Sequence, residues 1–266
     1  MCKYVLITGA YGGMGYACAK LLAKKGFTVF ALDILVREAE PNIIPVKADL
    51  TDQESVLNAY KTVSNITEEL YAIIHFAGVY RLDSLVEMSE ERFKEIFDIN
   101  VFGAYRINKT FLSLLKSGSR VIITTSELAP LQPLAFTGIY AVSKCTLEKY
   151  AFSLRMELQF LGVKVAVIRP GAVDTGLLSV STKELDNFTK NTKIYTYNAD
   201  KFKKIVDKTE SKSVAPQAIA KTAFKALSAK NPKYVYNVNR NIFLRLLNLL
   251  PAKLQTKIIG NILKQK

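Results

Sequence analysis

A glycine-rich turn near the start of the sequence restricts the fold more than any other feature. An apolar run over residues 3–8 leads into Thr8-Gly9-Ala10-Tyr11-Gly12-Gly13-Met14-Gly15, and a helical pattern follows over residues 16–25. Glycines permit a tight turn and a close approach to the backbone, and the unpaired N–H groups at a helix start attract phosphate. A strand, a glycine turn and a helix in this order therefore predict a dinucleotide-binding unit. Four glycines within seven residues disfavour the alternative of a turn that is merely flexible.

The next predicted strand, over residues 27–32, bears on the form of the dinucleotide. It ends at Asp33, where a carboxylate can accept hydrogen bonds from both ribose hydroxyls of an adenosine and repel a 2′-phosphate. NAD is therefore favoured over NADP. Arg37 lies close to Asp33 in the sequence, and because a nearby arginine can accommodate the phosphate, NADP remains an alternative.

Strands and helices alternate along most of the chain. Strands are predicted over residues 3–8, 27–32, 43–48, 70–76, 119–125, 163–169 and 233–238, the last of them edge-like, and helices over residues 16–25, 52–63, 89–116, 138–160 and 216–229. This alternation is typical of a parallel sheet with helices on both faces. A chain of 266 residues, 49% of them hydrophobic, fits one large domain better than two small ones. We therefore predict an α/β fold, a Rossmann-type doubly wound parallel sheet of about seven strands in a single domain over residues 1–239.

Composition bears on location and partners. The three cysteines, Cys2, Cys18 and Cys145, are odd in number and lack C-x-x-C spacing, which predicts reduced thiols in the cytoplasm and no structural zinc. We expect no secretory leader, because the first predicted strand begins at Lys3 without a charged leader, an apolar core and a cleavage site before it. We expect no membrane span, because no apolar run reaches ~20 residues. The net charge of +14 suits a nucleotide, an anionic lipid surface or nucleic acid. We favour a solvated lysine-rich surface, and expect no nucleic-acid partner and no metal site.

The segment from Ser126 to Lys144 carries the residues best suited to chemistry. Tyr140 and Lys144 are four positions apart, so both side chains lie on one face of the helix predicted there. A neighbouring ammonium favours the phenolate and lowers the pKa of a tyrosine, and Tyr140 could then exchange a proton with a substrate oxygen. Ser126 follows the predicted strand over residues 119–125, at the edge where open α/β sheets bind ligands. A Tyr-Lys pair at this spacing is by itself also common on protein surfaces.

Two segments near the C-terminus do not fit the alternation. Residues 176–213 are rich in Thr, Lys and Asn, and we predict a long connection that forms a lid or a binding loop over the substrate, with a disordered linker as the alternative. Its scattered apolar residues are Leu177, Leu178, Phe188, Ile194, Tyr195, Tyr197, Phe202 and Ile205. Residues 240–266 form a basic, amphipathic helical tail broken at Pro251. Such a tail can lie in a membrane interface, cap an active site or pack on a partner subunit, and the sequence leaves all three open.

Together these motifs resemble the short-chain dehydrogenase/reductase family over residues 3–238. The resemblance is carried by Thr8, Gly9, Gly13, Gly15, Asp33, Asp49-Leu50, Asn100, Ser126, Tyr140-x-x-x-Lys144, Pro170-Gly171 and Thr175. It implies an oxidoreductase that acts on CH–OH groups. It also implies that Tyr140 is the general acid/base, that Lys144 binds the nicotinamide ribose and lowers the pKa of Tyr140, and that Ser126 bonds to the substrate oxygen. Asn100 would hold a water near Lys144 for proton relay.

The family pattern further implies a set of cofactor-binding residues. They are Gly9, Tyr11, Gly13, Met14, Gly15, Asp33, Asp49, Leu50, Ala77, Gly78, Tyr140, Lys144, Pro170, Gly171, Val173 and Thr175. In this pattern Asp49 meets the adenine ring, and Pro170, Gly171 and Thr175 contact the nicotinamide. The expected cofactor is NAD, with NADP as the alternative.

The sequence departs from the family pattern after the fourth predicted strand. Phe76-Ala77-Gly78 stands where the family usually has Asn-Ala-Gly, which removes an amide that could brace neighbouring strands. Residues 73–78 look instead like the epimerase-type branch of the same superfamily, as does the glycine spacing at 9, 12 and 15. The chain length, the R-P-G-x-V-x-T segment at 169–175 and the lack of a sizeable sugar-nucleotide domain favour the compact oxidoreductase.

The tail suggests the class of substrate. It looks like the tail of the hydroxysteroid and retinol dehydrogenases of the family, which implies a lipophilic secondary alcohol or ketone that is steroid-, retinoid- or lipid-like. A lipid-precursor ketone or an unrelated small carbonyl compound would fit as well. The resemblance also implies a homodimer or homotetramer, and residues 240–266 suggest peripheral contact with a membrane. The alternative from another class is a scaffold that binds NAD without turnover, which the intact Asn100, Ser126, Tyr140 and Lys144 disfavour.

Overall fold

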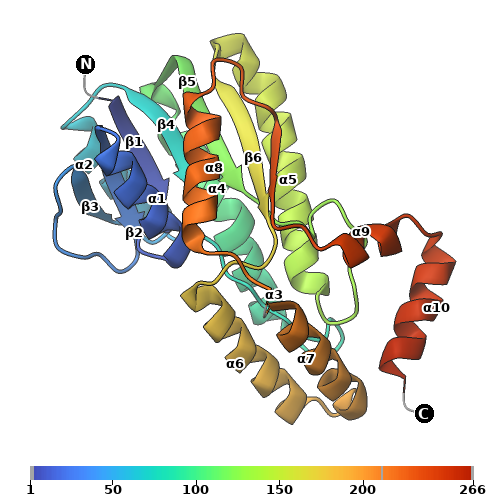
Figure 1. The fold of residues 1–266 in the computed structure, drawn as a ribbon. Coiled ribbons are helices and arrows are strands. Elements are labelled where there is room, and N and C mark those ends of the chain that lie inside the picture. The colour runs from blue at the N-terminus through green and yellow to red at the C-terminus, as the bar shows by residue number, and fades with distance from the viewer. Residues whose placement is uncertain (1–2, 211, 265–266) are drawn as a thin grey trace.

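The centre of the fold is a parallel sheet of seven strands in the order β3-β2-β1-β4-β5-β6-β7 (Figure 1). The computed structural model describes residues 3–210 and 212–264, without the side chains of residues 177–181, 209 and 210. Cys2 and the side chains of Leu177 and Leu178 therefore lie outside the described part. The strands are β1 (Lys3–Thr8), β2 (Phe27–Asp33), β3 (Ile43–Lys47), β4 (Leu70–His75), β5 (Leu115–Thr124), β6 (Lys164–Pro170) and β7 (Val235–Val238). This arrangement confirms the predicted doubly wound sheet.

Helices cover both faces of the sheet, and each face has its own apolar core. α1 (Gly13–Lys24) and α8 (Pro216–Ser228) pack on one face, where Leu22 and Ile219 are fully buried (Figure 1). α2 (Gln53–Ser64), α4 (Gly103–Thr110) and α5 (Gly138–Leu158) cover the other face. The helices thus hold the sheet so that the carboxyl ends of its strands stay free for a site.

The helix predicted over residues 89–116 is interrupted and ends early. α3 (Glu90–Phe97) passes through a π-helical turn (Asp98–Phe102) into α4, and a 3-10 turn (Leu112–Leu114) follows. β5 then begins at Leu115, which pairs with Leu70 of β4 before the register shifts. The prediction was wrong here because this pairing joins residues far apart in the sequence, and no local pattern reports it.

Residues 176–213 are mostly two helices, so the predicted loop was wrong. α6 (Gly176–Asn191) and α7 (Thr196–Glu210) lie side by side beyond the carboxyl edge of the sheet (Figure 1). Their inward side chains form a third core with two residues from other segments; its buried members are Leu82, Leu185, Phe188, Ala199, Phe202 and Leu263. The polar outer faces of the two helices hid the helical spacing of these apolar positions.

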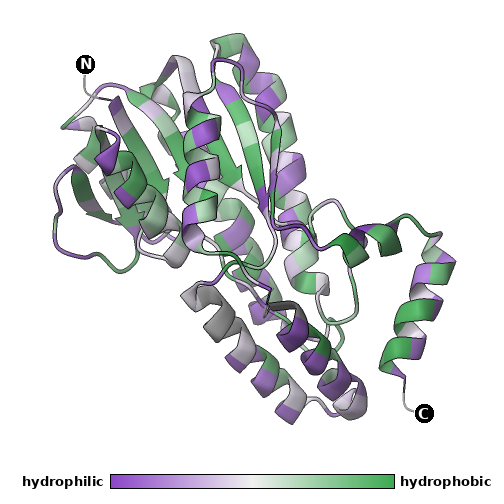
Figure 2. Cartoon of the chain, viewed as in Figure 1, coloured by the Kyte–Doolittle hydropathy of each residue, from purple (hydrophilic) through white to green (hydrophobic). Residues whose placement is uncertain are grey.

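The tail contains two helices, α9 (Ile242–Asn248) and α10 (Ala252–Leu263), on either side of Pro251. α10 packs on α7, where the Asn198 side chain donates to the Leu263 carbonyl at 2.8 Å. Apolar residues run along both tail helices (Figure 2), and on α9 Ile242, Phe243 and Leu246 are exposed. Among the described helices, none is long and apolar enough to cross a membrane.

Candidate active site

A pocket lies at the carboxyl edge of the sheet, where the segments that follow β1, β4, β5 and β6 meet. The residues predicted for catalysis or cofactor binding that line it are Met14, Gly78, Ser126, Tyr140, Lys144, Pro170, Gly171, Val173 and Thr175. Much of the remaining wall is apolar and includes Phe202, Ile205 and Val206 of α7 and Leu244 of α9. The fold therefore joins the glycine turn, the Tyr-Lys pair and α7, within the segment predicted to be a lid, in one cavity.

Tyr140 and Lys144 occupy the first turns of α5 and face the same side of that helix. The Lys144 Nζ lies 5.9 Å from the centre of the Tyr140 ring and donates to the Thr124 carbonyl at 3.3 Å. The Tyr80 ring meets the Tyr140 ring edge-on, with the ring centres 4.6 Å apart. Ser126, at the end of β5, hydrogen-bonds to the Tyr140 hydroxyl. The serine hydroxyl, the phenol and the ammonium thus converge on one end of the pocket.

The ionisation of this group differs from the prediction. We expected Lys144 to lower the pKa of Tyr140, but burial raises the pKa of Tyr140 to about 12, while the Ser126 hydrogen bond lowers it and the Glu127 charge raises it further. Burial also lowers the pKa of Lys144 to about 8. The prediction was wrong because it counted the ammonium and left out the removal of both groups from water, which opposes their charged forms.

Asn100 lies in the π-helical turn and is 1% exposed. Its Oδ1 accepts from the Val79 N–H at 2.8 Å, and its Nδ2 donates to the Val79 carbonyl and to the Ser143 hydroxyl, both at 3.1 Å. A Cβ on Gly78 would come within 3.0 Å of the Asn100 Oδ1 and 3.2 Å of the Lys144 Nζ. Asn100 therefore holds the segment after β4 close to Lys144.

The glycine turn has the shape that a pyrophosphate needs. A Cβ on Gly15 would lie 2.1 Å from the Gly9 carbonyl oxygen, and a Cβ on Gly13 would lie 2.6 Å from the Thr175 side chain. α1 begins at Gly13, and its N-cap, Gly12, has no side chain that could bond to the first-turn N–H groups. These donors suit a phosphate, so the turn fits a dinucleotide.

The residues predicted for the adenosine end lie around this turn. The Asp33 Oδ2, at the end of β2, accepts from the Tyr11 N–H at 2.9 Å. The Arg37 guanidinium lies over the Tyr16 ring, 4.5 Å from its centre. The Ala77 N–H donates to the Thr8 hydroxyl at 3.4 Å, which ties the end of β4 to the end of β1. Asp33 and Arg37 thus both lie beside the glycine turn, as the predicted adenosine site requires.

Asp49 and Leu50 are held by local contacts. The Asp49 Oδ1 accepts from the Thr51 N–H at 2.9 Å and from the Thr51 hydroxyl at 2.7 Å. The Leu50 carbonyl accepts from Arg106 at 2.9 Å. One Asp49 oxygen is therefore committed to its own turn, which leaves the other for the predicted contact with adenine.

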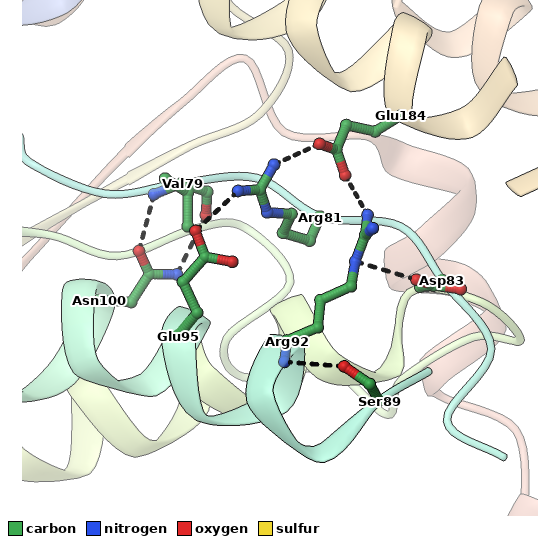
Figure 3. A network of polar contacts seen from close by, with 8 residues as sticks. All are labelled: Val79, Arg81, Asp83, Ser89, Arg92, Glu95, Asn100 and Glu184. Atoms are coloured by element: carbon green, nitrogen blue, oxygen red, sulfur yellow. Dashed lines mark hydrogen bonds and ion pairs between the residues drawn. The ribbon is translucent and has the colours of Figure 1, made fainter. Parts of the chain in front are cut away.

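An ion cluster joins α6, in the segment predicted to be a lid, to α3 and the segment after β4 (Figure 3). Glu184 of α6 pairs with both Arg81, which follows β4, and Arg92 of α3. Arg81 also pairs with Glu95 at 3.1 Å, and the Arg92 Nε pairs with Asp83 at 3.1 Å. The same segment carries Val79, so the Asn100 contacts and the lid are linked through a few residues.

Sequence reasoning missed part of the pocket wall. The missed residues include Phe76, Tyr80, Glu127, Asn241 and Leu244. The departure at Phe76 was itself a signal, because the phenyl ring replaces an amide at the end of β4 and lines the cavity. The tail residues Asn241 and Leu244 agree with one of the three predictions for the tail, that it caps the active site. Glu127 gave no such signal.

Known proteins match this chain over most of its length. Residues 3–186 match the family described as short chain dehydrogenase. Estradiol 17-beta-dehydrogenase 2 of Mus musculus is 28% identical over 288 residues, covering 99% of this chain and 74% of that protein. The uncharacterized oxidoreductase YbbO of Escherichia coli is 31% identical over 268 residues, covering 97% of this chain and 94% of its own. A short chain dehydrogenase family protein from Francisella tularensis superimposes with a TM-score of 0.75 at 25% identity, covering 90% of this chain and 97% of that one.

Proposed function

The chain belongs to the short-chain dehydrogenase/reductase family and is an oxidoreductase acting on CH–OH groups, and from that premise we propose that it transfers a hydride between NAD and a lipophilic secondary alcohol or its ketone. One observation carries the proposal. A single pocket contains Ser126, Tyr140 and Lys144, reaches Met14 and Thr175 beside the glycine turn, and is walled by apolar side chains of the lid and tail.

Each polar residue of the pocket has a role in this reaction. The nicotinamide, when bound, accepts or supplies the hydride. The Tyr140 hydroxyl exchanges a proton with the substrate oxygen, and Ser126 donates a hydrogen bond to the same oxygen. Because a phenol with a pKa of about 12 is protonated at neutral pH, Tyr140 is ready to donate a proton to a ketone. Lys144 binds the nicotinamide ribose and, when charged, stabilises the phenolate in the oxidation direction, and Asn100 holds a relay water beside it.

The apolar wall supports a steroid-, retinoid- or lipid-like substrate. Leu128 and Leu134 from the segment between β5 and α5 face the same pocket as Phe202, Ile205 and Leu244. Burial of a hydrocarbon against such a wall contributes roughly 25 cal/mol for each Å² removed from water. The similarity to a protein named as an estradiol dehydrogenase points in the same direction.

Asp33 supports NAD as the cofactor. Its carboxylate at the end of β2 would bond to the adenosine ribose and repel a 2′-phosphate. NADP is the alternative, because Arg37 lies beside this position. In the same proposal, Asp49 and Leu50 bind the adenine end of the cofactor.

Initial rates with a panel of secondary alcohols and ketones, each with NAD(H) and NADP(H), test the proposed function. We expect turnover of lipophilic members with NAD, and Tyr140→Phe should lower kcat by ~10²-fold or more with nearly unchanged NAD affinity. Tyr105→Phe, on the exposed side of α4, is the matched control and should behave like the wild type. Near-normal turnover in Tyr140→Phe would remove this residue from the mechanism. NAD binding without turnover of any panel member would instead support a scaffold.

The exposed side of α9 supports peripheral contact with an anionic membrane. Phe243 is 72% and Leu249 80% exposed, close to the basic Arg240 and Arg245. Apolar side chains beside cations are typical of helices that lie in a lipid interface. We expect co-sedimentation with vesicles containing phosphatidylserine, lost at high salt and in the Phe243→Ser/Leu249→Ser double variant, which leaves the pocket wall intact. A wild-type protein that stays in the supernatant would end the membrane proposal.

Exposed aromatic residues support a homodimer or homotetramer. Phe93, Phe102, Tyr105 and Phe152 are each 40% exposed or more on α3 to α5 and the turn between them. Apolar surface of this kind often marks an interface between subunits. A monomer mass in light scattering would contradict the proposal.

A cytoplasmic location is supported by the free thiols of Cys18 and Cys145.

A further inference from the structure

Glu127 places a carboxyl group in the wall of the substrate pocket. It follows Ser126 directly, is 7% exposed, and lines the same cavity as Tyr140. Its N–H donates to the Pro170 carbonyl at 2.8 Å, which fixes the residue against the end of β6. A carboxylate surrounded by apolar side chains is unfavourable unless it is partnered, so its presence here calls for a physical reason.

The protein donates a hydrogen bond to only one of the two oxygens of this carboxyl group, within the described residues. The Glu127 Oε2 accepts from the Asn241 backbone N–H at 2.6 Å, while the Oε1 has no hydrogen-bond donor within the described part of the chain. The Oε1 lies 2.9 Å from the place that a Cβ on Gly171 would take, so the absence of a side chain at 171 makes room for it. The positive charge of Arg240 lowers the pKa of this carboxyl group, without an ion pair between the two residues.

We propose that Glu127 is a specificity-determining residue, which admits neutral or hydrogen-bond-donating substrates and rejects substrates that carry an anionic group near the reacting carbon. The inference rests on the proposed function, because it assumes that the reacting carbon of the substrate lies beside Ser126 and Tyr140. The Oε1 offers an acceptor to a hydroxyl or amide of the ligand. The charge opposes a carboxylate, phosphate or sulfonate in the same space, where the surrounding protein screens charges less than water does.

The field of Glu127 also reaches the catalytic phenol. The carboxylate raises the pKa of Tyr140, so it favours the protonated phenol. Burial raises the pKa of Glu127 itself, and the Asn241 N–H and Arg240 pull it back. Glu127 is thus linked both to the entering ligand and to the ionisation of Tyr140.

Binding of two matched probes tests the proposal without requiring turnover. Octane-1-sulfonate is permanently anionic, and methyl octyl sulfone has a similar shape without the charge. Calorimetry gives the dissociation constant of the sulfone, and displacement of the sulfone by the sulfonate gives that of the sulfonate in the same pocket. Glu127→Gln removes the charge and keeps an oxygen that accepts from the Asn241 N–H. Glu68→Gln, on an exposed residue before β4, removes a charge remote from the pocket.

We expect the wild type and Glu68→Gln to bind the sulfone at least about tenfold more tightly than the sulfonate, and Glu127→Gln to reduce this ratio about tenfold. An unchanged ratio in Glu127→Gln, or an equal reduction in Glu68→Gln, would overturn the proposal. If the panel of alcohols and ketones shows no turnover but the ratio responds to Glu127, the proposed reaction fails while the specificity role stands.

A second measurement applies if Glu127→Gln does not fold. In the wild type, the preference for the sulfone should shrink as the pH falls from 7 to 4.5, the ordinary pKa of a glutamate, because burial raises the pKa of Glu127 above that value. The charged or titratable groups around it are Tyr140 and Lys144 on α5 and Arg240, and Arg240 in turn feels the charges of Arg245 and Arg169. Tyr140, with a pKa of about 12, keeps its proton over this range, and Lys144, with a pKa of about 8, is already mostly charged at pH 7. A preference that does not change with pH would overturn the proposal.

Discussion

The single histidine of the chain makes one pH effect unusually easy to isolate. His75 ends β4, directly before the Phe76-Ala77-Gly78 segment of the site, and is 4% exposed. Its Nε2 bonds to the Asn108 Oδ1 at 2.9 Å, and the Asn108 Nδ2 donates to the Tyr150 hydroxyl at 3.1 Å. Burial lowers the pKa of His75 from 6.5 to about 4, so the ring is neutral in the folded protein at neutral pH.

Acid should therefore destabilise the fold through His75. The unfolded chain binds a proton at a pKa of 6.5, but the folded chain binds it only at about 4. Above pH 6.5 the ring is neutral in both states, and between 6.5 and 4 the unfolded state takes up the proton first, so the free energy of unfolding falls. At about 1.4 kcal/mol for each pH unit between the two pKa values, the total loss is about 3 kcal/mol, of which about 2 kcal/mol falls between pH 7 and pH 5.

Urea unfolding of the wild type and of His75→Gln, followed by circular dichroism at pH 7 and pH 5, measures this loss. Glutamine keeps a donor for Asn108 and has no proton to gain, while every carboxyl group of the protein titrates in both proteins. The free energy of unfolding should fall by about 2 kcal/mol more in the wild type than in the variant over this range. An equal fall in both proteins would refute the reasoning.

Two further predictions follow from the cofactor site and the lid. Asp33→Ser should narrow the preference for NAD over NADP, measured as the ratio of the two kcat/KM values, because it removes the charge that opposes a 2′-phosphate; a wild type that prefers NADP would show that Arg37 dominates. Glu184→Gln should lower the Tm by about 2–4 °C and speed proteolysis within α6 and α7. The reason is that Arg81 and Arg92 lose their ion pairs with Glu184, which together contribute roughly 1 kcal/mol to the free energy of unfolding. Glu90→Gln, which breaks an exposed pair with Lys94 on α3, is the control, and equal effects of the two changes would contradict a special role for Glu184.

The sheet could be predicted because its strands are local apolar runs separated by turn residues. Each of the seven strands overlaps its predicted range, although β5 begins four residues early. Asp52, the first residue of the helix predicted over residues 52–63, is the N-cap of α2, and its side chain accepts from the Glu54 N–H at 2.9 Å. The start of β5 could not be predicted, because Leu115 joins the sheet through Leu70, forty-five positions earlier in the chain. Local periodicity reports which face of an element is apolar, but it does not report where a distant strand offers backbone partners.

The lid shows a related limit. The apolar residues of α6 and α7 are few, and each helix alone exposes a mostly polar surface that is typical of a loop. They become helices with a core only when they pack on each other and on α10, where Phe188, Phe202 and Leu263 meet. The helical state is thus stabilised by contacts between segments that a local pattern treats separately.

In the candidate site, too, some features could be predicted from local spacing and others depend on tertiary packing. Tyr140 and Lys144 could be paired from sequence because helical spacing alone puts them on one face, and Ser126 because it ends a recognisable strand. The direction of the Tyr140 pKa could not be read from that pairing, since spacing reports the neighbouring ammonium and says nothing of the desolvation that outweighs it. Glu127 joins the site for a third reason, because the tail returns to the pocket and the Asn241 N–H orients the carboxyl group. A motif therefore predicts which groups meet, whereas the ionisation of those groups and the selection of ligands depend on the protein that closes around them.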